Sequence, residues 1–396
     1  MVGAGCVMAI KTLENQGKDA PKYKVKALTA PKAKSLSDFS GAGRVRNCAV
    51  LTALGLTRAI APPNIALLLI PAATVDFANL YSPIDTDMRA VDTVVRARLH
   101  SEIVLVRQVA EYIISAGGKR MRPALVLLSA GACGYSGKNH HELAAVVEFI
   151  HTATLLHDDV VDESALRRGR DTANAVFGNA ASVLVGDFLY SRAFQMMVGV
   201  GSMRVMQVLA DATNVIAEGE VLQLMNCRNA DISVDEYLQV IRYKTAKLFE
   251  AAGRLGAILG SVDPSTEEAM ASYGMHIGTA FQLIDDVLDY SGVEAETGKH
   301  LGDDLAEGKP TLPLIHVIQH GTSEQAALVR NAIENANRDD FPAVLAAVRT
   351  SGALDAARVH GLAESNAAKA ALTVLPDSKF KETLLQLCDF AVERKF

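Results

Sequence analysis

Two clusters of aspartates stand at the ends of long apolar segments. Each has the pattern D-D-x-x-D, and together they comprise Asp158, Asp159, Asp162, Asp285, Asp286 and Asp289. On a helix, residues at i and i+4 share a face, so the first and last aspartates of each cluster project together. Like charges at this spacing repel one another and destabilise the helix. Such clusters therefore require a compensating cation.

The carboxylate oxygens of these clusters predict a magnesium site. Mg²⁺ is a hard cation that binds through one or two carboxylates together with substrate phosphates and water. Two clusters facing each other would hold a diphosphate through two or three bridging ions. The alternative for one cluster is a solvated helix face or a helix N-cap. Two copies within apolar helices, about 127 residues apart, favour the metal site.

Cations that could bind phosphate accompany the aspartates. The Gly-rich turn Gly117-Gly118 precedes Lys119 and Arg122, and such a turn lets the backbone approach a phosphate closely. The other candidates are Arg167, Arg168, Lys244, Lys299 and Lys309. Each one alone would be an ordinary surface charge. A site for two diphosphates needs several of them in combination with the metal ligands.

The elements that must position these residues are helices. From about Pro83 onward, apolar residues recur at helical spacing, and Gly or Pro marks the joints. The pattern predicts helices over 123–134, 140–163, 179–200, 203–226, 234–260 and 264–290, two more near 311–320 and 324–337, and shorter ones within 341–392. We expect no strand, because no segment alternates apolar and polar residues convincingly. The predicted fold class is all-α, as one large helical bundle.

The amino-acid composition supports the all-α prediction and bears on the kind of partner that the protein binds. The 396 residues are 49% hydrophobic and only 5% aromatic, and they include no Trp, a profile that favours helices. Residues 1–80 carry ten Lys and Arg against four Asp and Glu, whereas the remainder carries 29 against 41. An acidic body argues against nucleic acid as the main partner.

The cysteines and the longest apolar stretch bear on the compartment. The five cysteines lie far apart, without a C-x-x-C pair, so they indicate neither a zinc site nor a disulfide scaffold. Reduced cysteines fit a cytoplasmic protein. Three prolines interrupt the most apolar stretch, residues 60–75, so no transmembrane segment is predicted.

Residues 1–80 differ from the rest of the chain, because their lysines are interspersed with Pro, Ala and Ser without periodicity. We expect a basic, disordered leader or an upstream start-site artefact, with Met88 as the alternative start. An organelle transit peptide is a second interpretation, although such peptides are rich in Arg rather than Lys. A secretory signal is disfavoured, since no apolar segment follows the first basic residues. The predicted catalytic domain is 81–396.

The order of the motifs resembles the trans-isoprenyl diphosphate synthase family. G-G-K-R-x-R-P is followed by D-D-x-x-D with R-R-G, then K-T, F-Q-x-x-D-D-x-x-D and G-K-x-x-G-D-D, from about residue 85 to the C-terminus. Residues 148–197 look most like the bacterial long-chain branch of octaprenyl diphosphate synthases, which make the side chain of ubiquinone or menaquinone. The resemblance implies the isoprenoid-synthase bundle around a central active-site cavity, and a homodimer.

The resemblance also implies roles for the candidate residues. All six aspartates would bind Mg²⁺ at the allylic diphosphate, Asp159 in a flanking role. The diphosphate of isopentenyl diphosphate would be held by Lys119, Arg122, His151 and Arg168. The allylic diphosphate would contact Arg167, Lys244 and Lys299, with Lys309 nearby. Thr245 and Gln282 would sit beside the developing carbocation, and together with Lys244 they form the predicted catalytic group.

The implied reaction is chain elongation. The cations and metal would stabilise the departing pyrophosphate, and isopentenyl diphosphate would then attack the allylic cation. Ala153 and Thr154, one turn before the first cluster, would set the product length. Both are small, which predicts an open pocket and a product of seven to ten isoprene units. A deeper floor, or ordinary core, would be formed by Phe194, Met196 and Met197.

Two other functions are compatible with parts of this pattern. A terpene cyclase also carries D-D-x-x-D on an all-helical fold, but its second motif mixes Asn, Ser or Thr with an acid. The second cluster here consists of carboxylates alone, which favours elongation. A non-catalytic subunit of a heteromeric synthase would have lost aspartates from one or both clusters, and both are intact here.

Overall fold

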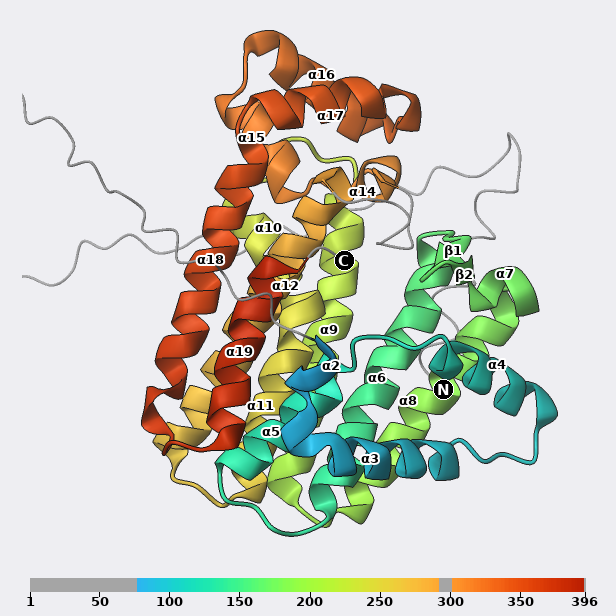
Figure 1. Cartoon of the computed structure of the whole chain (residues 1–396). Coiled ribbons are helices and arrows are strands. Elements are labelled where there is room, and N and C mark those ends of the chain that lie inside the picture. Colours follow the sequence, from blue (N-terminus) through green and yellow to red (C-terminus); the bar gives the residue numbers. More distant parts are fainter. Residues whose placement is uncertain (1–76, 292–300, 395–396) are drawn as a thin grey trace, which may run out of the picture. The chain divides into compact units, whose positions relative to one another are not determined.

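The computed structural model describes residues 77–291 and 301–394, and these form helices almost throughout (Figure 1). The elements before the middle of the chain are α2 (Phe77–Leu80), η1 (Ser82–Ile84), α3 (Asp85–Arg98), α4 (Val104–Ser115), α5 (Met121–Ala132), α6 (Asn139–Val161), β1 (Leu166–Arg167), β2 (Arg170–Asp171), α7 (Ala173–Phe177), α8 (Asn179–Gly199) and α9 (Met203–Asn226). The predicted all-α fold is confirmed.

The second part of the chain continues the bundle. Its elements are α10 (Val234–Ile241), the π turn η2 (Arg242–Ala246), α11 (Lys247–Leu259), α12 (Pro264–Ser291), α14 (Asp303–Ala306), α15 (Leu312–His320), α16 (Ser323–Asn335), η3 (Arg338–Asp340), α17 (Phe341–Thr350), α18 (Ala353–Ala371), η4 (Leu372–Val374) and α19 (Lys379–Glu393).

Three sequence predictions differ from the structure in detail. The single helix expected over 234–260 is interrupted by the π turn at Arg242–Ala246. The region 341–392 contains α18, a helix of 19 residues, where only shorter helices were expected. Residues Leu166–Arg167 and Arg170–Asp171 form an antiparallel hairpin, where no strand was expected, because two-residue strands are too short to show alternation.

Local signals explain where several helices begin. α10 starts with a capping box, in which the Ser233 side chain accepts from the Glu236 N–H and the Glu236 carboxylate accepts from the Ser233 N–H. Before α12, the Asp263 carboxylate accepts from the N–H groups of Ser265 and Thr266. These side chains satisfy donors that a helix N-terminus leaves without partners.

The centre of the bundle is packed closely because glycines allow backbones to touch. A Cβ on Gly274 of α12 would lie 2.2 Å from the carbonyl oxygen of Phe249, and a Cβ on Gly253 of α11 would lie 2.4 Å from that of Met270. Side chains larger than hydrogen would therefore force α11 and α12 apart. This contact matters for the site, since α11 follows the π turn and α12 carries the second aspartate cluster.

A smaller apolar cluster lies at one end of the bundle, where α15, α16 and α17 gather (orange, top of Figure 1). Tyr290, near the end of α12, is fully buried in this cluster with Leu314 and Val329. The cluster thus anchors the end of the helix that bears the second set of aspartates.

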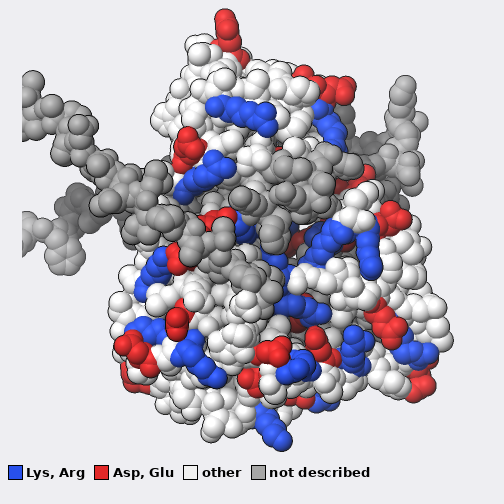
Figure 2. Space-filling view, in the orientation of Figure 1, with Lys and Arg blue, Asp and Glu red and all other residues white. Residues whose placement is uncertain are grey.

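The short helix α2 lies directly before residue 81, and the predicted start of the catalytic domain there remains a prediction. The predicted domain begins at residue 81, yet Leu80 of α2 is buried in the main core. Within the described part of the chain, no helix is both long enough and apolar enough to cross a bilayer. Basic and acidic side chains are interspersed over the visible part of the face in Figure 2.

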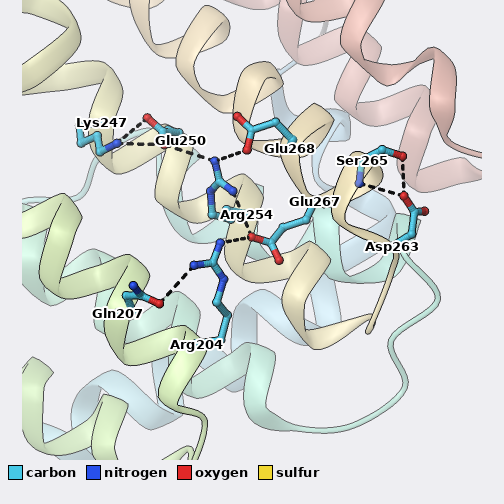
Figure 3. Close-up of polar contacts among 9 residues, drawn as sticks. All are labelled: Arg204, Gln207, Lys247, Glu250, Arg254, Asp263, Ser265, Glu267 and Glu268. Atoms are coloured by element: carbon cyan, nitrogen blue, oxygen red, sulfur yellow. Dashed lines mark hydrogen bonds and ion pairs between the residues drawn. The ribbon is translucent and has the colours of Figure 1, made fainter.

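A network of ion pairs ties three helices together away from the apolar core (Figure 3). Arg254 of α11 lies 3.0 Å from Glu267 and 2.8 Å from Glu268, both in the first turns of α12. Arg204 of α9 lies 2.6 Å from the same Glu267 oxygen. Acidic residues at a helix N-terminus also interact favourably with the helix dipole. The network therefore fixes the start of α12 against α9 and α11.

We predict that Arg254→Ala lowers the free energy of unfolding by about 1–2 kcal/mol, because the substitution removes a largely buried guanidinium that pairs with the partly buried Glu267 and with the exposed Glu268. The measurement is urea denaturation followed by circular dichroism. Arg358→Ala is the control, since Arg358 is half exposed and makes only long contacts, with the exposed Asp355 at 3.5 Å and with the Ser291 hydroxyl at 3.4 Å, and exposed ion pairs contribute about 0–1 kcal/mol. Equal effects of the two substitutions would contradict this prediction.

Candidate active site

A cavity of about 820 Å³ opens within the bundle and contains most of the predicted site residues. Its walls come from the start of α5, the end of α6, the hairpin, α9, the π turn, α12 and the segment around α14. The aspartates that line it are Asp158, Asp162, Asp285, Asp286, Asp289, Asp303 and Asp304. The two clusters, far apart in the sequence, thus face one space. Cavities of this size with convergent polar groups are typical binding sites.

The first cluster stands where α6 ends, a position where the helix dipole disfavours negative charge. Two lysines compensate: Lys244 Nζ lies 3.6 Å from Asp158, and Lys309 Nζ lies 2.9 Å from Asp162. Burial acts to lower the pKa of each lysine, but the neighbouring carboxylates outweigh burial and raise both. Both lysines are therefore charged at neutral pH.

Asp159 differs from its neighbours, because it does not line the cavity. Its side chain is fully buried, and Arg167 of β1 contacts the same carboxylate oxygen through Nε at 2.8 Å and Nη2 at 2.7 Å. Burial raises the pKa of Asp159, and Arg167 opposes that rise. In this arrangement both residues hold the hairpin against α6. Their predicted contacts with metal and allylic diphosphate remain predictions.

The β1–β2 hairpin places the R-R-G motif, residues 167–169, beside the Gly-rich turn at residues 117–118. Arg168 (φ 54°) and Gly169 (φ 73°) form its two-residue loop with positive φ at both positions, as the favoured hairpin turn requires. The Arg168 guanidinium packs directly on Gly118, where a Cβ would lie 2.8 Å from it. Only glycine at position 118 permits this approach. Gly118 and Arg168, which are 50 positions apart in the sequence, thus place the two basic motifs on one wall of the cavity.

Beside this wall, Arg122 Nη1 lies 3.1 Å from His151 Nε2, and the Arg122 guanidinium stacks 4.5 Å from the centroid of the Phe249 ring. Burial, and then the surrounding arginines, lower the pKa of His151 well below its usual value. The imidazole is therefore neutral and can accept a hydrogen bond from Arg122. Burial also lowers the pKa of Arg122 to about 10, which leaves it charged at neutral pH.

The second cluster is held by a chain of hydrogen bonds. Thr245 Oγ1 donates to Gln282 Oε1 at 3.0 Å, and Gln282 Nε2 donates to Asp286 Oδ1 at 2.8 Å. Tyr237 Oη donates to the other oxygen of Asp286 at 2.5 Å. Burial raises the pKa of Asp286 to about 8. The outer residue Asp285 lies 2.6 Å from Arg394.

The catalytic candidates Lys244 and Thr245 lie on the π turn. Turns of this kind are rare and occur frequently at functional sites. The turn fits closely against α9, where a Cβ on Gly219 would lie 2.6 Å from the backbone nitrogen of Lys244. The next residue, Glu220, lies 2.6 Å from Lys244 Nζ. Burial, and then Asp158, raise the pKa of Glu220 to about 7.

The predicted chain-length residues occupy two environments. Thr154 lines the cavity, and its hydroxyl donates to the carbonyl of His151 at 2.8 Å. Ala153 is fully buried in the main apolar core and is not among the cavity-lining residues. Met196 and Met197 are also buried in that core, and Phe194 packs against it. Their influence on product length remains a prediction.

Comparison with known proteins identifies the family of this chain. The family model described as polyprenyl synthetase matches residues 103–348. The chain belongs to the polyprenyl synthetase family. It is therefore a prenyltransferase of a metal-dependent family that uses isoprenyl diphosphates.

Several polyprenyl synthetases are close relatives. Octaprenyl diphosphate synthase of Escherichia coli strain K12 is 53% identical over 309 residues, which cover 78% of this chain and 96% of that protein. A polyprenyl synthase from Caulobacter crescentus, crystallised with calcium and isoprenyl diphosphate, is 44% identical with a TM-score of 0.79, covering 81% of this chain and 98% of that one. A decaprenyl diphosphate synthase from Rhodobacter capsulatus is 45% identical with a TM-score of 0.77, and the match covers 81% of this chain and 100% of that one.

Several cavity residues were not predicted from the sequence of this polyprenyl synthetase. Glu148 pairs with Arg120 at 3.0 Å, and both line the cavity. Glu220 could have been found, because it is an acid at the edge of the apolar segment of α9. Arg394 does not line the cavity but contacts Asp285, which does. No sequence signal indicated this contact, since only folding brings the C-terminal region onto α12. The predicted residue Lys299 lies outside the described residues.

An ion-pair cluster outside the cavity holds the π turn of this synthetase in place. Arg242, the first residue of the turn, lies 3.0 Å from Glu364 of α18, and His276 Nδ1 of α12 lies 2.5 Å from the other Glu364 oxygen. Burial acts to raise the pKa of Glu364, but its hydrogen bonds with His276 and Arg242 outweigh burial and lower it. Glu364 thus connects the turn to both α12 and α18.

We predict that Glu364→Gln lowers the free energy of unfolding by about 1–2 kcal/mol at pH 7, after allowance for solvent screening. Because the folded-state pKa of Glu364 is below its ordinary value of 4.5, the stabilisation is complete above about pH 4.5 and is lost as the pH falls through the folded pKa. Urea denaturation from pH 7 to pH 3 measures this. The exposed Glu334→Gln is the control, and a difference that does not shrink in acid would contradict the prediction.

Proposed function

We propose that this chain is a Mg²⁺-dependent long-chain trans-polyprenyl diphosphate synthase. It would condense isopentenyl diphosphate onto an allylic diphosphate such as farnesyl diphosphate, with octaprenyl diphosphate as the product, for the side chain of a quinone. The observation that carries the proposal is that aspartates of both all-carboxylate clusters and several half-buried cations line one cavity. The octaprenyl product is supported by the 53% identity to the Escherichia coli octaprenyl diphosphate synthase.

The donor set of the cavity fits magnesium. Its candidate ligands are hard carboxylate oxygens from two helices, as Mg²⁺ prefers. Asp158, Asp162, Asp285 and Asp289 would hold the ions, with Asp286 in support and Asp159 in a flanking role. Bound there, Mg²⁺ would supply positive charge that stabilises the departing pyrophosphate. The calcium in the related Caulobacter crescentus structure supports a divalent cation in this fold.

The side chains proposed to bind phosphate divide into two groups by position. Lys119, Arg122, His151 and Arg168 lie together at the start of α5 and its neighbours, and they would hold the diphosphate of isopentenyl diphosphate. Lys244 and Lys309 lie beside the first aspartate cluster, on the side of the allylic diphosphate. Arg167 and Lys299 are assigned to the same diphosphate by the family resemblance.

The chemistry depends on keeping a carbocation away from water and close to negative charge. The allylic C–O bond breaks as its electron pair leaves with pyrophosphate, and the double bond of isopentenyl diphosphate attacks the resulting cation. Thr245 and Gln282 present oxygen dipoles near this centre, and Lys244 stabilises the leaving group. Pyrophosphate takes the proton lost from the new chain.

Further assignments follow from the same resemblance. The chain would act as a homodimer in the cytoplasm, where reduced cysteines persist, and Cys133, Cys227 and Cys388 are free thiols in the structure. The catalytic domain would be the predicted segment 81–396 together with the short helix α2. The leader would then be the part of residues 1–80 that precedes α2, and the burial of Leu80 in the main core supports this division.

We predict that Asp158→Asn and Asp285→Asn each reduce incorporation of labelled isopentenyl diphosphate by about 10²–10³-fold, because each removes a charge that stabilises the departing pyrophosphate. Chelation with EDTA should abolish incorporation, and added Mg²⁺ should restore it. The exposed Asp211→Asn on α9 is the control. Incorporation that survives both EDTA and Asp158→Asn would refute the proposed mechanism, and no product from the purified chain would favour a non-catalytic subunit.

We predict that Ala153→Phe shortens the product to about three or four isoprene units, because the larger ring would close the path of the growing chain. Thr154→Phe places the same bulk on a residue that lines the cavity, in case Ala153→Phe disturbs the core. Mass spectrometry of the product from farnesyl diphosphate measures the length. Ala346→Phe, on the exposed face of α17, is the control. A product of unchanged length from both variants would remove this explanation.

A further inference from the structure

A second group of possible metal ligands lies outside the cavity, where the first turn of α3 meets the N-terminus of α6. It consists of Asp87, His140 and His141, and one ligand atom from each lies within 4.8 Å of the others. The Nε2 atoms of His141 and His140 are 2.9 Å and 3.4 Å from the same Asp87 oxygen. None of the three lines the cavity.

We propose that these three residues bind a late first-row divalent metal ion such as Zn²⁺. A tetrahedral Zn²⁺ with bonds of about 2.0–2.1 Å places its ligand atoms about 3.3–3.4 Å from one another. The separations of 2.9 Å and 3.4 Å need only small adjustments to reach that spacing. Two imidazole nitrogens and one carboxylate oxygen suit Zn²⁺ better than Mg²⁺, which prefers oxygen ligands alone.

The surroundings hold the two rings in place while leaving room for a fourth ligand. The side chains of His140 and His141 are 13% and 18% exposed, whereas that of Asp87 is 36% exposed. The His140 ring packs edge-on against Tyr135, with centroids 5.5 Å apart, and Tyr135 Oη accepts from the Asn139 N–H at the start of α6. The accessible side at Asp87 would admit a water molecule.

Two features limit the affinity of this site. The N-terminus of α6 presents a positive dipole end, which Asp87 must offset. His140 Nδ1 is buried without a hydrogen-bond partner among the described residues, whereas zinc-bound histidines usually donate that N–H to an acceptor. We therefore expect micromolar rather than nanomolar binding. The bound ion would clamp α3 to α6, the helix whose other end carries the first aspartate cluster.

The test is isothermal titration calorimetry of the metal-free full chain with Zn²⁺, in excess Mg²⁺ to occupy the aspartate clusters. We expect one Zn²⁺ per chain, with a dissociation constant at least tenfold higher in His141→Ala and in Asp87→Asn. His100→Ala, just beyond the C-terminal end of α3, and Asp92→Asn, within α3, are the matched controls on exposed residues and should bind as the unaltered chain does. Visible absorption of the Co²⁺-loaded chain reports tetrahedral coordination independently.

Zn²⁺ binding that is the same in the unaltered chain, His141→Ala and Asp87→Asn would overturn the proposal, as would the absence of any Zn²⁺ binding. If His141→Ala fails to fold by circular dichroism, Asp87→Asn and His140→Ala decide the question. None of these readouts depends on prenyl transfer, so the metal site and the proposed function can fail separately.

Discussion

The structure depends on balancing carboxylates with cations in one cavity. Asp158 and Asp162 stand at the negative end of α6, and Lys244 and Lys309 offset their charge. Without substrate, these lysines neutralise the cluster internally. A diphosphate with its metal ions would bring both signs of charge. The aspartates could then exchange the lysines for metal ions, and the lysines could exchange the aspartates for phosphate oxygens. The site is therefore arranged for a ligand that carries phosphate and metal together.

The helical frame keeps these charges from relaxing away from one another. α11 and α12 pack through glycines at backbone contact, and Glu364 connects α12 and α18 to the first residue of the π turn. Lys244 thus sits on a turn that is fixed on several sides. Preorganised charge of this kind stabilises a transition state without the cost of rearrangement.

Much of this could be predicted because its signals are local. Helical periodicity located the long helices, and the two D-D-x-x-D patterns located the carboxylates. The prediction was less complete where a residue's role depends on contacts distant in sequence. Asp159 belongs to the same D-D-x-x-D motif as Asp158 and Asp162. Its carboxylate nevertheless pairs with Arg167 and does not line the cavity. The π turn was not predicted, because its residues continue the same helical pattern.

The amino-acid sequence by itself determined the fold class, the family and the candidate residues for metal and phosphate binding, because periodicity and motif spacing are properties of short segments. Tertiary structure alone decided which charges meet. It paired Lys309 with Asp162, placed Arg394 on Asp285, and brought Asp87 to His140 and His141. The physical reason is that each of these contacts joins residues from different elements, and only the packing of those elements sets the distance between them.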